Sequence, residues 1–354
     1  MKEVTKIIER QTAVKTVNPE HILQIGMGFF ASKTLLTAVN MQLFTLLAQE
    51  PLTAGEIKLK LGLHQRSYLD FLDSLVALGM LQRSGIGEDA IYSNTEETNI
   101  FLDKNKPSYI GGILEMSNGR LYKFWNNLED GLKTGLPQNE LKNGNLKNQF
   151  YEIYSDENKL TEFLRAMAGI QMGPFMALVK QFDFSDYTSF CDVGGGSGAL
   201  CIQVAANYPG IRCINFDLPE VEKIANKTIE NSGLSSRIKT FSGDFFIEDL
   251  PNSDVIAMGN ILHDWNEEEK LILFKKAYDA LPRGGAFICI ENIIDNDRSK
   301  NVFGLLMSLN MLIETRAGFD FTFNDFDQWA HTTGFRKTEW LPLVGPTSAA
   351  VAYK

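Results

Sequence analysis

From Tyr187 onward, short apolar runs typical of buried strands alternate along the chain with amphipathic segments of helical length. The strand-like runs are SFCDV, CINFDL, IKTFSGDFF, VIAMGNIL and AFICIENII. The helical segments between them cover about Ala199 to Tyr208, the residues after Pro219 and the residues after Asn266. Strands and helices that alternate in this order favour an α/β fold, a doubly wound domain with a mostly parallel sheet.

The first third of the chain has the helix, turn, helix and hairpin pattern of a winged helix. Thr53 can cap one helix, with Glu56 in the spacing of a capping box. A second helix is predicted over about residues 64–78, and Gly79 is suited to be its left-handed cap. Its apolar face would comprise Leu69, Leu72 and Val76. Two strand-like runs around SGIGED predict a hairpin over residues 80–92.

Charge argues against the DNA-binding role of many winged helices. Between Thr53 and Tyr92 there are four basic and five acidic residues, a net charge of 4 − 5 = −1, and the whole chain carries 34 − 44 = −10. A phosphate-binding face should be strongly positive. We therefore expect no nucleic-acid partner and no anionic membrane partner, and predict that this module forms a homodimer with a second copy.

The length of 354 residues predicts two domains, which we place at residues 1–106 and 107–354. Residues 107–184 are rich in aromatic side chains and methionine and predict further helices, with a break near Gly131 to Pro137. The apolar stretch from Val302 to Ile313 is too short to cross a bilayer, so no membrane span is expected. The first 14 residues lack the pattern of a secretion signal or transit peptide, which predicts a cytoplasmic protein.

Four cysteines lie far apart with no C-x-x-C pair, and three of them fall in strand-like runs. We predict that they are small core residues rather than disulfide or metal partners. The cysteines are Cys191, Cys201, Cys213 and Cys289.

A glycine-rich motif, DVGGGSG from Asp192 to Gly198, ends one strand and opens a helix. Its glycines let the backbone turn tightly against a ligand, and the helix N-terminus offers free N–H groups to an anion. The motif alone is ambiguous. Gly194, Gly196 and Ala199 also fit the fingerprint of dinucleotide-binding proteins, with Asp217 near the position of the ribose carboxylate, so a nicotinamide oxidoreductase stays open.

Acidic residues end the next two strands. Asp217 in FDLP can accept hydrogen bonds from both hydroxyls of a ribose, and Asp244 in GDFF can accept one from an adenine amino group. Phe245 offers a flat apolar face to a purine. With these motifs the sequence resembles the class I S-adenosylmethionine-dependent O-methyltransferases of small molecules, of plant caffeate and flavonoid type, hydroxyindole type and bacterial relatives. The resemblance spans nearly the whole chain, including the winged-helix dimerisation domain.

The resemblance implies a Rossmann-like domain that binds S-adenosylmethionine. The cofactor-binding set that it implies comprises Asp192, Gly194, Gly196, Asp217, Leu218, Gly243, Asp244, Phe245, Asn260 and Tyr154. Asp192 and the glycines would lie against the methionine part of the cofactor. The acceptor-binding set comprises Phe163, Met167, Trp265 and Met311. Core filling is the alternative for the two methionines.

The motif HDW, from His263 to Trp265, follows the fourth strand of the α/β region. Ligands of open α/β sheets bind at the carboxyl ends of the strands, so His263 should face the same crevice as the cofactor. The family uses this histidine as its general base. Glu291 resembles the acidic residue that orients it, and Asp320 falls where many relatives carry a second, longer glutamate. The other three histidines, His21, His64 and His331, are expected at the surface or on helices.

Two further points complete the expectation. Met258 to Asn260 replaces basic or aromatic residues of relatives, and Gly259 has no side chain with which to reach the cofactor. No cluster of His, Asp and Glu at ligand spacing indicates a metal. The sequence thus predicts O-methylation of a hydroxyl, phenolic by chemistry, on a small and largely apolar molecule. C- or N-methylation within the family, the oxidoreductase and a ligand-sensing winged-helix regulator are the alternatives.

Overall fold

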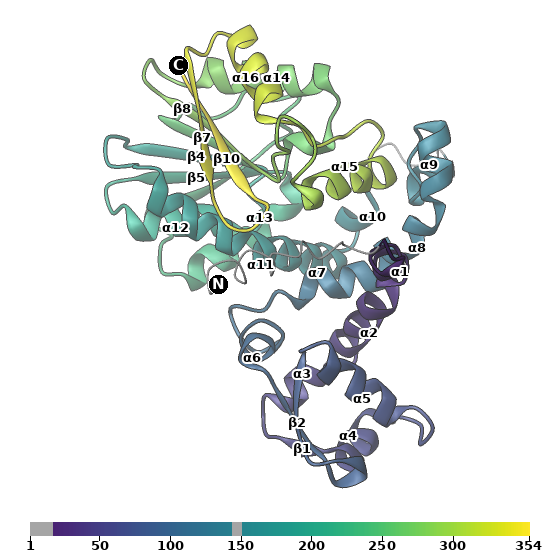
Figure 1. The fold of residues 1–354 in the computed structure, drawn as a ribbon. Helices are drawn as coiled ribbons and strands as arrows, with labels where there is room; N and C mark the ends of the chain where they lie inside the picture. The colour runs from purple at the N-terminus through teal and green to yellow at the C-terminus, as the bar shows by residue number, and fades with distance from the viewer. Residues whose placement is uncertain (1–16, 144–150) are drawn as a thin grey trace, which may run out of the picture. The chain divides into compact units, whose positions relative to one another are not determined.

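The computed structural model describes residues 17–143 and 151–354 (Figure 1). The first 14 residues, on which the prediction of location partly depends, lie outside this range. Contacts divide the chain into two compact units between Asn99 and Ile100. This division falls seven residues before the predicted domain boundary.

The first unit has the elements of a winged helix. Its helices are α1 Glu20–Gly26, α2 Gly28–Asn40, α3 Leu43–Leu47, α4 Ala54–Leu61 and α5 Tyr68–Ala77, and the division between the two units falls within α6 Glu96–Phe101. Its strands are β1 Leu52–Thr53, β2 Leu81–Ser84 and β3 Ile91–Asn94, with a 3-10 turn at Gly87–Asp89. The predicted hairpin is the antiparallel pair β2 and β3, and β1 adds an edge that the sequence did not predict. The predicted capping box of Thr53 and Glu56 is present at the start of α4.

Helix α5 differs from its prediction in its start and in its buried face. The helix begins at Tyr68, because residues 64–67 form turns in which the N–H of Arg66 donates to Nδ1 of His64. The fully buried positions are Tyr68, Leu72 and Leu75, whereas the predicted Leu69 and Val76 are half-buried. Gly79 has the expected left-handed backbone, with φ of 73°.

Helices α1 and α2 expose a row of large apolar side chains. These side chains include Ile22, Leu23, Ile25, Phe29 and Phe30. Residues Glu20–Asn40 are long and apolar enough to cross a membrane, a feature that our sequence analysis overlooked when it considered only Val302 to Ile313. Length and composition alone are weak evidence for a span, because the core helix of a soluble protein and a signal sequence pass the same test.

The second unit opens with a series of helices. They are α7 Gly111–Met116, a π-helical turn Ser117–Leu121, α8 Tyr122–Phe124, a 3-10 turn Trp125–Asn127, α9 Leu128–Thr134, a 3-10 turn Glu140–Asn143, α10 Tyr151–Tyr154 and α11 Glu157–Gln181. The predicted break comes later than Gly131, since α9 continues to Thr134 and ends at Gly135 in the left-handed conformation. The N–H groups of Asn158 and Lys159 donate to the side chain of Asp156, which caps the start of α11.

A seven-stranded sheet with the order β6-β5-β4-β7-β8-β10-β9 forms the centre of the second unit. Its strands are β4 Ser189–Val193, β5 Arg212–Asp217, β6 Ile238–Ser242, β7 Val255–Gly259, β8 Ala286–Glu291, β9 Lys337–Pro342 and β10 Ser348–Tyr353. The first five strands in this order are parallel, and β10 runs antiparallel to both of its neighbours. The predicted α/β class with a mostly parallel sheet is confirmed, while β9 and β10 were not predicted.

Helices cover both faces of this sheet, as the doubly wound prediction requires (Figure 1). They are α11, α12 Ala199–Asn207 and α13 Pro219–Asn231 on one face, and α14 Glu267–Ala280 and α16 Phe323–Thr333 on the other. Helix α15 Val302–Glu314 lies beside α9 and the turn after β7. In β8, Ile288 and Ile290 pack with α11 and α12, whereas Phe287 and Cys289 pack with α14 and α16. Two apolar faces explain the nearly continuous apolar runs of these strands. All four cysteines are buried and unbonded, which confirms their predicted place in the core.

Candidate active site

The glycine loop follows β4 at the carboxyl end of the sheet. The N–H groups of Gly194 and Gly195 donate to the carbonyl oxygen of Phe216, at 2.8 and 3.2 Å. Gly194 and Gly196 have positive φ angles of 71° and 52°. A Cβ at Gly195 would lie 2.1 Å from Oδ1 of Asn215, so only glycine fits there.

The carboxylate of Asp217 is held in place at the end of β5. Its Oδ2 accepts a hydrogen bond from the N–H of Gly196, and its Oδ1 accepts one from the N–H of Leu218, each at 2.7 Å. Burial raises the pKa of Asp217 to about 6, although these N–H groups act in the opposite direction. Burial, and then the charge of Asp217, also raises the pKa of Asp192. Buried carboxylates of this kind gain from ligand hydroxyl or ammonium groups that donate to them.

At the end of β6, Oδ1 of Asp244 accepts a hydrogen bond from the N–H of Phe246 at 2.8 Å. Phe245 and Phe246 both meet the ring of Trp265 edge to face, with centroids 5.8 and 4.6 Å apart. Gly243 has a packing role, because a Cβ there would come within 2.9 Å of the Phe216 ring. The rings beside Asp244 form an apolar wall next to a polar group.

These segments surround one open cavity of about 1100 Å³, counting the space at its mouth. Twelve of the fourteen predicted cofactor-binding and acceptor-binding residues line it: Asp192, Gly194, Gly196, Asp217, Leu218, Asp244, Phe245, Asn260, Tyr154, Phe163, Met167 and Trp265. Gly243 and Met311 do not line the cavity, and Met311 is buried in α15. Asn260 has a positive φ of 53°, a conformation that asparagine tolerates better than most residues.

The cavity also has lining residues that the sequence analysis did not single out. They include Leu164, Ala168, Gln171 and Phe175 of α11, together with Phe246, Ile261 and Asp264. A Cβ at Gly259 would lie 2.9 Å from Oε1 of Gln171, so Gln171 occupies space that a larger residue 259 would need. A four-residue spacing from Phe163 to Phe175 was the available signal for the α11 residues.

The cavity fits an adenosine-containing cofactor. Asp217 presents a fixed carboxylate, and the glycine loop leaves room where any Cβ would intrude. Burial, followed by the charge of Asp217, raises the pKa of the Tyr154 hydroxyl above its usual range, so this group stays a neutral donor. Carboxylates, a neutral hydroxyl and aromatic walls suit a ligand with hydroxyl and amino groups and a flat ring.

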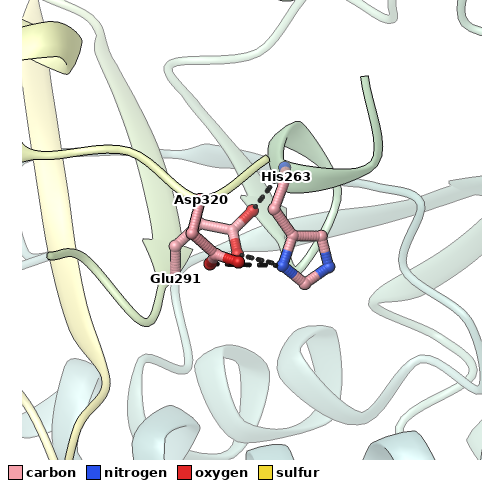
Figure 2. A group of neighbouring side chains, drawn as sticks. All are labelled: His263, Glu291 and Asp320. Carbon is pink, nitrogen blue, oxygen red and sulfur yellow. Dashed lines mark hydrogen bonds and ion pairs between the residues drawn. The ribbon is translucent and has the colours of Figure 1, made fainter. Parts of the chain in front are cut away.

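His263 lies in a 3-10 turn, Leu262–Asp264, that follows β7 (Figure 2). Its Nδ1 faces two carboxylates, with Oε2 of Glu291 at 3.2 Å and Oδ1 of Asp320 at 3.5 Å. Its backbone N–H donates to Oε1 of Glu291 at 3.3 Å. Its Nε2 lies 3.8 Å from Oδ1 of Asp264, which lines the cavity, although His263 itself is not among the lining residues.

The charges of this cluster are strongly coupled. Burial alone would lower the pKa of His263, but the carboxylates of Glu291, Asp264 and Asp320 outweigh it and raise that pKa above 6.5. Burial raises the pKa of Glu291 and, to about 6, that of Asp264, while His263 opposes both shifts. The cluster therefore stabilises the protonated imidazole, which makes the neutral imidazole a stronger base.

The cluster also contains the atom types of a metal site, which sequence spacing did not reveal. One ligand atom from each of His263, Glu291 and Asp320 lies within 4.8 Å of the others. Both carboxylates face the same imidazole nitrogen, an arrangement that orients and charges a base. The expectation that no metal takes part stays a prediction. Among the remaining histidines, His21, His64 and His331 are exposed, as expected.

Two family models match the chain. One, described as an O-methyltransferase domain, matches residues 125–336, and the other, described as an O-methyltransferase dimerisation domain, matches residues 23–104. The chain therefore belongs to the O-methyltransferase family, and it is a methyltransferase that depends on S-adenosylmethionine. These matches give no support to the oxidoreductase or the regulator that the sequence had left open.

Relatives of known name match along nearly the whole chain. The tetracenomycin polyketide synthesis 8-O-methyl transferase TcmO of Streptomyces glaucescens is 35% identical, over 95% of this chain and 97% of the relative. Acetylserotonin O-methyltransferase of Bos taurus is 31% identical, over 92% and 95%. The structure of human N-acetylserotonin methyltransferase with S-adenosylmethionine matches with a TM-score of 0.88 and 27% identity, over 96% of this chain and 99% of that one.

Proposed function

We propose that this O-methyltransferase moves a methyl group onto a phenolic hydroxyl of a small, largely apolar aromatic molecule, with His263 as the general base. The observation that carries the proposal is the orientation of His263, whose Nδ1 faces Glu291 and Asp320 beside the cavity. Trp265, two residues further on, lines that cavity, so the turn that carries the base also forms a wall of the site.

The proposed roles of the chain's residues follow from the chemistry. S-adenosylmethionine supplies, when bound, a methyl group already activated by its sulfonium. A proton held on Nδ1 between the two carboxylates leaves Nε2 of His263 to accept the proton of the acceptor hydroxyl. A phenol with a pKa of about 10 is mostly protonated at neutral pH, so its proton must be removed during the reaction. The carboxylates of Glu291 and Asp320 make His263 more basic and so favour transfer of this proton to the imidazole. Glu291 and Asp320 would act as positioning residues.

The cofactor roles are likewise proposals. Asp192, Gly194 and Gly196 would contact the methionine part, and Asp217 with Leu218 would contact the ribose. Asp244 and Phe245 would contact the adenine. Gly243 would allow the backbone to pack closely against the ring of Phe216. Tyr154 and Asn260 would complete this set, and Phe163, Met167 and Trp265 would contact the acceptor. For Met311 the support is the family resemblance alone, since it lies outside the lining residues.

Named activities of relatives support an aromatic acceptor. TcmO is an 8-O-methyl transferase of polyketide synthesis, and a relative from Streptomyces sahachiroi, 28% identical over 94% of both chains, is a 3-hydroxy-5-methyl-1-naphthoate 3-O-methyltransferase. Another relative, OxyT of Streptomyces rimosus, is an N,N-dimethyltransferase, 30% identical over 82% of both chains. N-methylation is therefore the second candidate, and C-methylation is a further alternative.

The experiment that tests the proposal incubates the purified protein with labelled S-adenosylmethionine and panels of phenols, aromatic amines and carbon nucleophiles. Mass spectrometry then locates the transferred methyl group. Methyl ethers of phenols are expected, with unchanged yield after treatment with a chelator. Methylation of amines or carbon alone would overturn the phenolic assignment. A loss of activity after chelation that added metal restores would overturn the expectation that no metal takes part.

For His263→Ala we expect turnover with a phenol to fall by about 10²–10⁴, the usual contribution of a positioned base. Cofactor affinity should stay nearly unchanged, because the glycine loop, Asp217 and Asp244 are intact. Raising the pH toward the pKa of the phenol should partly restore turnover. His331→Ala, which removes an exposed imidazole, is the matched control. Full turnover of His263→Ala at neutral pH would assign His263 a structural role.

We also propose residues 1–106 as the dimerisation domain and residues 107–354 as the catalytic domain, with residues 107–184 shaping the acceptor pocket. The match of residues 23–104 to a dimerisation domain supports a homodimer. The absence of nucleic-acid and anionic membrane partners stays the expectation from the net charge of −10. A cytoplasmic location stays the expectation from the composition of the first 14 residues.

A further inference from the structure

Helix α14 carries a lysine whose side chain is completely buried. Lys270 has no exposed surface, and its Nζ donates hydrogen bonds to the carbonyl oxygens of Trp265 and, at 3.2 Å, of Phe319. Trp265 follows His263 by two residues, and Phe319 precedes Asp320 directly. One ammonium group therefore joins the turn that carries the proposed base to the segment that carries one of its two carboxylate neighbours.

The same ammonium group lies against aromatic rings. Its Nζ is 3.4 Å from the ring centroid of Phe319 and 5.8 Å from those of Phe321 and Trp329. Cation–π contacts of this kind offset part of the cost of removing a charge from water. A surface lysine needs no such surroundings, so Lys270 has a specific place inside the fold.

Ionisable groups from several elements face Lys270 or its neighbours. The turn after β7 contributes His263 and Asp264, β8 contributes Cys289 and Glu291, and the segment before α16 contributes Asp320. Glu314, at the end of α15, acts on Asp264. Burial lowers the pKa of Lys270 to about 8, while Glu291, Asp320 and Asp264 act to raise it. The group is thus mostly protonated at neutral pH, and its positive charge interacts with three carboxylates, of which Glu291 and Asp320 are buried.

We propose that Lys270 is a positioning residue of the methyl-transfer site, whose buried ammonium group ties the His263 turn to the Asp320 segment and offsets the negative charge around His263. The proposal rests on the proposed role of His263. Close packing in the same region agrees with such a tie, since a Cβ at Gly318 would lie 2.4 Å from the carbonyl oxygen of His263.

The sign of the expected effect follows from charge. A cation disfavours protonation of its neighbours, so its removal raises the pKa values of His263 and of the carboxylates around it. A base must be unprotonated to accept a proton, so the acid limb of the turnover profile should move to higher pH. We expect an upward shift of about 1 pH unit at most, below the effect of a charge in direct contact, because the charges that Lys270 meets directly are those of the carboxylates around His263.

The test compares Lys270→Met, Lys270→Gln and Lys270→Arg in the full-length protein. Methionine removes both charge and donor, glutamine keeps a donor without charge, and arginine keeps the charge. Lys275→Met, on the same helix but exposed, is the matched control. Two quantities are measured: the pH dependence of kcat with a phenolic acceptor, and the titration of the His263 imidazole by nuclear magnetic resonance without acceptor.

Both charge-removing variants should raise the pKa of His263 and move the acid limb of kcat to higher pH. Lys270→Arg and the control should leave both quantities near the wild-type values. Affinity for S-adenosylhomocysteine should change less than about twofold in all variants. Folded Lys270→Met or Lys270→Gln with a wild-type titration of His263 would reduce Lys270 to a packing residue. A shifted titration without a shifted kcat profile would retain the influence of Lys270 on His263 and contradict the role of His263 as base. The glutamine variant gives the answer if the methionine variant does not fold.

Discussion

Two carboxylates face one nitrogen of His263, and this arrangement fixes the direction in which pH should affect the enzyme. Because Glu291 raises the pKa of His263, the variant Glu291→Gln should lower that pKa toward 6.5. The acid limb of kcat then moves to lower pH. The maximal turnover should fall, though less than in His263→Ala, because a weaker base remains. A kcat profile between pH 5 and 10 measures both effects.

The control for this prediction uses a second histidine and carboxylate pair. Asp327 lies 3.3 Å from Nδ1 of His331 on an exposed face of α16. Asp327→Asn should leave the kcat profile unchanged, since this pair lies at the surface. A Glu291→Gln variant whose acid limb stays in place or moves upward would contradict the proposed electrostatic role of Glu291.

At the scale of residues, the sequence predicted the polar groups that directly follow strands, because parallel strands bring their carboxyl ends to one edge. Asp217 and Asp244 were found in this way and line the cavity. Lys270 could not be found, because it follows three glutamates in a helix and has the local pattern of a solvated surface. Its burial depends on Phe319 and Trp329, which are distant in the sequence.

Among the elements, the glycine loop is held in a conformation that leaves no room for a side chain at Gly195. In Gly195→Ala the new Cβ would meet Oδ1 of Asn215 at 2.1 Å and Oδ2 of Asp192 at 2.9 Å. Asn215 cannot move aside freely, since its Nδ2 donates to the carbonyl oxygen of Gly196. Overpacking of about 1–3 kcal/mol should weaken binding of S-adenosylhomocysteine about tenfold or more, as calorimetry would measure.

Gly210→Ala is the matched control, because a Cβ at Gly210 meets nothing within 4 Å. It should bind S-adenosylhomocysteine as the wild type does. Thermal unfolding of both variants separates a local change in the loop from a general loss of stability. Unchanged affinity in a folded Gly195→Ala variant would argue against the assignment of this loop to the cofactor.

Strands were predicted correctly where composition and turn residues agreed, and they were missed where the sequence carried only one weak pattern. Two signals predict β4: the apolar composition of SFCDV and the glycine-rich turn that ends it. The last two strands have no such marks: β9 is half-exposed and ends in Pro342, and β10, SAAVAY, contains small residues that fit a helix equally well. Pairing with β8 and β9 determines that β10 is a strand.

For the whole molecule, we predict a homodimer that depends on the exposed apolar side chains of α1 and α2. Light scattering should report about twice the chain mass of 39.7 kDa. Phe30→Asp, at a position 58% exposed, should weaken the dimer, whereas Ile247→Asp, 76% exposed in the second unit, should not. A wild-type monomer at micromolar concentration would contradict the prediction. Co-sedimentation of the wild type with neutral lipid vesicles would instead indicate that Glu20–Asn40 contacts membranes.

Helix α11 contributes six residues to the lining of the cavity, and four of them follow one another at intervals of four residues: Phe163, Met167, Gln171 and Phe175. At 1.5 Å per residue this row extends over about 18 Å, and none of its members belongs to the sheet or its loops. Each of the four thus borders the cavity at a different position along the helix. The shape of the space available to an acceptor can therefore be changed one helical turn at a time, while the strand ends that surround the proposed cofactor position keep their sequence.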